Sequence, residues 1–144
     1  MTKSKRNGFT LVELLFVLAI LSILLALTMP LTISTVSNQQ ENQFFNTFQF
    51  DVLYTQNLSL GSKDYIRIIF NQEDYTILNG TTQEIIATRE LPPGWRIDKR
   101  NLNSISFNRN GSIRQAGTIS VFTGRSTYKI IFPIGKGRGY IEKE

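Results

Sequence analysis

One carboxylate stands at the start of a long apolar segment. Glu13 is followed, from Leu14 to Ile33, by residues that carry no charge. An acidic side chain costs about 2.5 to 3.5 kcal/mol at the centre of a membrane helix, so a partner is expected for it. Cleavage between Gly8 and Phe9 would create an ammonium group four residues before Glu13. That group could neutralise Glu13 of a neighbouring chain in one axial register only, so Glu13 is predicted to set the register of a helix bundle.

The apolar segment is long enough to cross a membrane. At about 1.5 Å per helical residue, Leu14 to Ile33 extends over roughly 30 Å, which is the thickness of a bilayer's hydrocarbon core. Lys3, Lys5 and Arg6 precede it. The positive-inside rule therefore predicts a single pass with a cytoplasmic N-terminus and an external C-terminal domain.

Three interpretations of this segment stay open at this point. A secretory signal peptide needs small residues at a cleavage site, for which Ala26-Leu27-Thr28 is a poor candidate. A plain membrane anchor gives no reason for Glu13. A helix that assembles with copies of itself or its relatives does give one.

Composition argues against an enzyme. The 144 residues include no cysteine and no histidine, which excludes thiol nucleophiles, disulfides, thiolate zinc sites and the usual base near pH 7. Glu73-Asp74 is an isolated acidic pair in an expected turn. No catalytic residue, cofactor or metal site is therefore predicted.

The helical pattern continues beyond the apolar segment. Apolar residues recur at helical spacing and predict one helix to about Leu58, stopped by Gly61. We expect this stripe to pack on the globular domain; it consists of Val36, Phe44, Phe45, Phe48, Val52 and Leu53.

Beyond Lys63 the period of the pattern changes to two. Short strands are predicted at residues 65–70, 75–78, 84–88, 95–97, 104–108, 118–122, 128–133 and 139–142, and Trp95 is predicted to be a core or rim residue. The fold class is therefore α+β: a long N-terminal transmembrane and amphipathic α-helix followed by a small antiparallel β-rich globular domain. The predicted parts are a leader at 1–8, an apolar helix at 9–35, its amphipathic continuation at 36–61 and the globular domain at 62–144.

The N-terminal stretch "KRNGFTLVELLFVLAILSILLALTMP" resembles the class III leader of type IV pilins and pseudopilins. The resemblance implies cleavage after Gly8 by a prepilin peptidase, N-methylation of Phe9, and storage in the cytoplasmic membrane. It also implies assembly with major and minor pilins, on an inner-membrane platform, into a cell-surface filament. Pro30 is similar to the helix-breaking proline of many pilins, and locally it removes one helical hydrogen bond.

The C-terminal region resembles the β-rich domain of the FimT and H-type pseudopilins. The stretches "SISFNRNGSI" and "YKIIFPIGKGRGYIEK" carry this resemblance. Along the whole chain the sequence is similar to minor pilins of Gram-positive competence systems. This implies a filament used for DNA uptake during natural transformation; the alternative is a pseudopilin of a secretion or adhesion filament.

The basic residues of the C-terminal half raise a further hypothesis. Residues 89–138 hold ten basic and two acidic residues. A basic surface neutralises phosphates without sequence preference, so a pilus-tip module that binds double-stranded DNA is an alternative function. The other interpretation is an ordinary solvated turn with charges complementary to acidic neighbouring pilins. The candidate DNA contacts are Arg109, Arg114, Arg125, Lys136 and Arg138.

Overall fold

The computed structural model describes residues 10–61 and 65–144, and for residues 28–35 it describes the backbone assignment without the side chains. Its element order is one helix followed by eight strands, which confirms the α+β class. The chain divides into two compact units, residues 1–39 and residues 40–144.

The first unit contains the beginning of α1 (Leu11–Ser59). Its large apolar side chains from Leu11 to Leu27 are all exposed, between 50% and 74%. The described residues are 10–61 and 65–144, without the side chains of 28–35. Among them, no helix is both long and apolar enough to cross a membrane. The span predicted for residues 9–35 stays a prediction. The helix break at Pro30 also stays a prediction. The structure assigns α1 across this residue, but the side chains there lie outside the described part.

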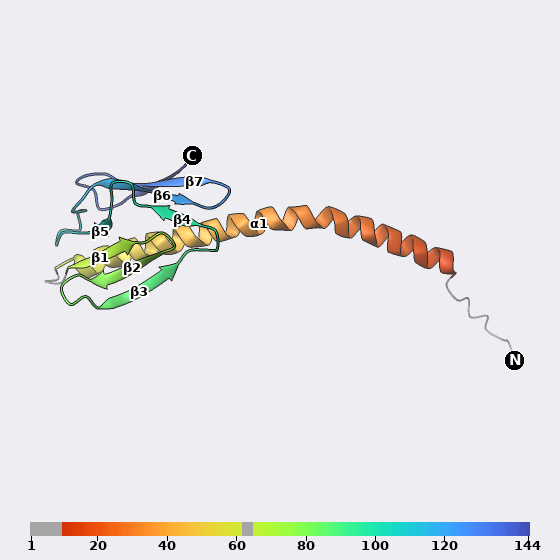
Figure 1. Cartoon of the computed structure of the whole chain (residues 1–144), viewed down its shortest axis with the longest axis horizontal. Helices are drawn as coiled ribbons and strands as arrows, with labels where there is room; N and C mark the ends of the chain where they lie inside the picture. Colours follow the sequence, from red (N-terminus) through yellow and green to blue (C-terminus); the bar gives the residue numbers. More distant parts are fainter. Residues whose placement is uncertain (1–9, 62–64) are drawn as a thin grey trace. The chain divides into compact units, whose positions relative to one another are not determined.

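The second unit contains the end of α1 and two antiparallel sheets. The first sheet has the order β3-β2-β1-β5 and the second β4-β6-β7-β8. Figure 1 shows β1, β2 and β3 on one side of the C-terminal part of α1 and β4, β6 and β7 on the other. The strands are β1 (Ile66–Phe70), β2 (Asp74–Asn79), β3 (Ile85–Glu90), β4 (Arg96–Asp98), β5 (Ser104–Ser106), β6 (Gly117–Phe122), β7 (Thr127–Phe132) and β8 (Tyr140–Lys143).

Each predicted strand overlaps one of these. The alternation of apolar and polar residues explains β1 and β2, whose apolar side chains point alternately into the core. The predicted helix end is also confirmed: α1 stops at Ser59, and Gly61 adopts φ +69°, a conformation that glycine tolerates best.

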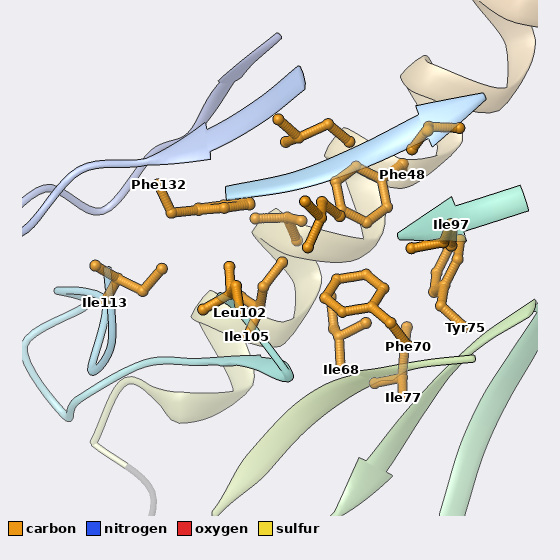
Figure 2. Packing of buried hydrophobic residues seen from close by; sticks show 14 of the residues in the cluster. Phe48, Ile68, Phe70, Tyr75, Ile77, Ile97, Leu102, Ile105, Ile113 and Phe132 are labelled. Atoms are coloured by element: carbon orange, nitrogen blue, oxygen red, sulfur yellow. The ribbon is translucent and has the colours of Figure 1, made fainter. Parts of the chain in front are cut away.

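A single cluster of buried apolar side chains joins α1 to both sheets. Figure 2 shows side chains from α1, β1, β2, β4, β5 and β7 converging on it. Phe48 of α1 is 2% exposed and contacts the rings of Phe70 and Tyr75, while Phe45 contacts the ring of Tyr128. Trp95 is buried, as predicted. Most of the predicted helix stripe therefore packs inward.

Two residues of that stripe do not. Val36, which belongs to the first unit, is 53% exposed. Leu53 is 39% exposed, although its spacing predicts the packing face. It lines a groove between α1 and the end of the second sheet, so the strands leave this edge of the stripe uncovered.

Candidate functional site

The first candidate site is the start of α1. The backbone N–H of Glu13 donates to Oγ1 of Thr10 at 3.3 Å, and the N–H of Leu14 donates to the Thr10 carbonyl at 3.2 Å. Thr10 is thus the N-cap of α1, and the spacing Thr-x-x-Glu is that of a capping box. This local role for Thr10 was readable from the sequence and was missed.

The Glu13 side chain is exposed in the single chain described. Gly8 and Phe9, the predicted cleavage site and N-methylated residue, lie outside the described residues. The pairing of Glu13 with a neighbour's ammonium group therefore stays a prediction. The apolar helix around Glu13 is consistent with contact to other chains, because a helix that is apolar all round is stable only where a membrane or other helices cover it.

Two buried carboxylates fix the end of α1 in the second unit. Glu41, 6% exposed, accepts hydrogen bonds from Oγ1 of Thr123 at 2.6 Å and from the hydroxyl of Tyr128 at 2.5 Å. Lys143 Nζ lies 4.0 Å from it. Desolvation acts to raise the pKa of Glu41, but these hydrogen bonds and the charges of Lys143 and Arg125 outweigh it and lower the pKa. Glu41 thereby ties α1 to the second sheet.

Asp51 makes the equivalent connection to the first sheet. It is also 6% exposed, and it accepts from the Tyr75 hydroxyl at 2.8 Å and from Nε of Arg89 at 3.1 Å. Burial, together with the bond to Asp51, raises the pKa of Tyr75, and the same carboxylate raises the pKa of Arg89. Ten residues separate Glu41 from Asp51, which turns their side chains about 80° apart on a helix and lets each face one sheet.

The sequence interpretation missed both carboxylates. They lie among polar residues that alternate with the apolar stripe, and nothing local distinguishes them from a solvated helix face. Their partners are 82 and 87 residues away for Glu41, and 24 and 38 for Asp51.

The five candidate DNA contacts do not lie on one surface element. Arg109 and Arg114 flank the Asn110-Gly111 turn, and Lys136 lies in the turn between β7 and β8. These two turns touch: the N–H of Ile113 donates to the carbonyl of Lys136 at 3.2 Å. The structure therefore brings together the turns that carry Arg109, Arg114 and Lys136, while the Arg114 guanidinium itself lies 4.8 Å from the ring centroid of Tyr65.

Glycine is needed where the two turns meet. A Cβ on Gly137 would lie 2.7 Å from the carbonyl oxygen of Gly111 and 2.4 Å from Nε2 of Gln56. Gln56 in turn donates to the Gly111 carbonyl at 2.6 Å. The turns are thus positioned by close backbone approach on the end of α1.

The remaining two basic residues lie elsewhere. Arg138 lines the groove beside α1, next to Phe132 and Ile141. Arg125 lies in the turn that precedes β7, whereas Lys136 follows β7, so the length of that strand separates them. Arg125 lines a polar hollow with Arg96, whose guanidinium lies 4.6 Å from the ring centroid of Phe122.

The acidic pair Glu73-Asp74 belongs to a turn. Asp74 accepts from the Asn71 side-chain amide at 2.6 Å, and its carbonyl accepts from the Asn71 N–H at 2.8 Å. Among the residues that the structure describes, no group of three or more acidic side chains lies close enough together to hold a metal ion.

The capped apolar helix start and the β-rich unit can be compared with known proteins, and the matches cover both the N-terminal segment and nearly the whole chain. The model of the prokaryotic N-terminal methylation motif matches residues 3–29. Over 142 residues, 98% of this chain and 96% of the relative, the sequence is 28% identical to "Competence protein ComGD" of Bacillus subtilis (strain 168). No solved structure matches the chain.

Proposed function

We propose that this chain is a minor pilin of a competence type IV pilus, with a structural rather than a catalytic role in DNA uptake during natural transformation. The observation that carries the proposal is the similarity to ComGD along nearly the whole chain, together with the methylation motif at residues 3–29. The capped, all-round apolar start of α1 supports it, since such a helix suits a filament core.

The finer parts of the proposal follow the leader motif. A prepilin peptidase cuts after Gly8, Phe9 is N-methylated, and residues 9–35 hold the chain in the cytoplasmic membrane with the N-terminus inside. Glu13 then finds the ammonium group of a neighbouring pilin during assembly on the inner-membrane platform. The globular part takes the β-rich arrangement of FimT and H-type pseudopilins.

The experiment is the transformation frequency of a clean deletion strain, with and without the wild-type gene restored. We expect transformation to be lost and then recovered. Normal transformation in the deletion strain, with protein secretion or surface adhesion reduced instead, would favour a filament of another kind. Mass spectrometry of the purified chain should find N-methylated Phe9 as the first residue; any other start contradicts the processing.

A second candidate function is contact with double-stranded DNA through the turns at 108–114 and 133–137. The contact between these turns supports it, because it places the segments that carry Arg109, Arg114 and Lys136 next to each other. Each phosphate contact contributes about 0.9 to the slope of log affinity against log salt, so replacing all three by Ala should lower that slope by about 2 to 3. The matched control is Arg125→Ala, and gel retardation with the full chain measures both. No retardation of the wild type at low salt excludes this function.

A further inference from the structure

Two arginines lie beside one tyrosine on the outer face of the first sheet. In β1, Ile66 and Ile68 are buried in the core, so the residues that alternate with them point away from it. Arg67 is one of these, and Tyr65 lies two residues before it on the same side. The guanidinium carbon of Arg67 is 5.8 Å from the centroid of the Tyr65 ring, and that of Arg114 is 4.8 Å from the same centroid. Two positive charges therefore share one ring.

The position of the ring is fixed by the neighbouring strands. The Tyr65 hydroxyl donates to Oγ of Ser106 at 3.3 Å, and Ser106 of β5 is the register partner of Arg67. A Cβ on Gly80, directly after β2, would lie 2.4 Å from Cδ1 of the ring, so a larger residue there would displace it. The N–H of Arg114 donates to the Ser106 carbonyl at 3.0 Å. The backbone that carries each arginine is thus held next to the ring.

Neither arginine has a counter-charge among residues 10–61 and 65–144. In this part of the chain Arg89, Lys129 and Lys143 each pair with a carboxylate, whereas Arg67 and Arg114 form no such ion pair. Nε of Arg67 is also buried without a hydrogen-bond partner there. A partly buried guanidinium is unfavourable in this state, and a second positive charge nearby adds repulsion that one ring offsets only in part. A bound anion would relieve the repulsion.

We infer that Arg67 and Arg114 bind a phosphate group beside Tyr65. One guanidinium satisfies the two oxygens of a carboxylate, whereas a phosphate has further oxygens for a second guanidinium. Arg114 is exposed, which gives the anion access. The phosphate can belong to a DNA strand or be free in solution, since both present the same oxygens. The inference goes beyond the proposed function, and only its DNA source rests on the second candidate function.

Inorganic phosphate tests the site without DNA. Added to the full chain in detergent micelles at constant ionic strength, it should shift the amide NMR signals of residues 65–67 and 106–114 with one affinity. Arg67→Gln should weaken this affinity about fivefold, and Arg67→Lys, which keeps the charge without the paired donors, about twofold. The matched control is Arg96→Gln, which removes a guanidinium 4.6 Å from the ring centroid of Phe122 and should change nothing. The Lys variant keeps the test valid if the Gln variant does not fold.

Duplex DNA distinguishes the two sources of phosphate. If the group belongs to DNA, Arg67→Gln should also lower the slope of log affinity against log salt by about 0.9 in gel retardation. Weaker phosphate binding with unchanged DNA retardation assigns the site to free phosphate.

Three results would overturn the inference. They are no shift of these signals by phosphate in the wild type, equal weakening by Arg96→Gln, and an affinity that neither change at Arg67 alters. None of them bears on DNA contact through the turns at 108–114 and 133–137, so the site and the second candidate function fail separately.

Discussion

The two units of this chain treat their apolar residues in opposite ways. From Leu11 to Leu27 the large apolar side chains are at least half exposed, while in residues 40–144 most such side chains pack in or against one core that includes Phe48, Phe70 and Tyr75. The second unit therefore contains its own stabilising contacts. The described side chains of the first unit form no such core, and we propose that neighbouring chains cover them, with Thr10 and Glu13 as the polar residues at the start of α1.

The largest effect is expected from truncating a side chain in the core of the second unit. Phe48→Ala removes a side chain that is 2% exposed and should lower the free energy of unfolding of the second unit by about 3 to 5 kcal/mol. Chemical denaturation of the full chain in detergent, followed by the fluorescence of the single tryptophan, measures this. Phe50→Ala is the matched control: this ring is 76% exposed and two residues away, and its loss should change little. Equal effects would refute the assignment of the core.

A smaller effect is expected at the buried ion pair. Asp51→Ala leaves the Tyr75 hydroxyl buried without its acceptor and Arg89 without its carboxylate, which should cost about 2 to 3 kcal/mol. Arg89 is itself half exposed, which limits the loss. Glu90→Ala, an exposed acidic residue beside Arg89, serves as the control in the same denaturation experiment. A loss no greater than that of the control would mean that Asp51 does not tie α1 to β2 and β3.

Glu41 makes the second unit sensitive to acid. Because its pKa is lowered in the folded chain, the stability it provides is present above its ordinary value of 4.5 and is lost as pH falls below it, through the folded pKa. Glu41→Gln should cost about 1 to 2 kcal/mol at pH 7, and the difference from wild type should shrink toward pH 3. Denaturation at a series of pH values measures both. A difference that stays constant across this range would contradict the role given to Glu41.

The smallest effect concerns the first unit. Thr10→Ala removes the helix cap and should weaken the first turn of α1 by about 1 kcal/mol, which speeds amide hydrogen exchange at Glu13 and Leu14 about fivefold. Thr10→Ser keeps the hydroxyl and should leave the exchange rates unchanged. Fast exchange in the wild type as well would show that the cap does not hold.

The helix end and the strands could be predicted from the sequence because their signals are local, whereas the pairing of the strands into two sheets could not. The eight strands follow from alternating apolar residues between turns, and the end of α1 follows from Gly61. The roles of Glu41 and Asp51 could not be predicted from the sequence, because the groups that bury them come from strands far along the chain. The separation of Arg125 from Lys136 could have been predicted from the sequence, because a six-residue strand between two turns places these residues at opposite ends of the strand.

The central claim is that the first unit acts through its neighbours in a pilus that takes up DNA. The most direct test is the transformation frequency of a deletion strain complemented with either the wild-type chain or Glu13→Ala, at equal protein levels. We predict that the wild type restores transformation and that Glu13→Ala does not, although its second unit folds normally. Full restoration by Glu13→Ala would contradict the account.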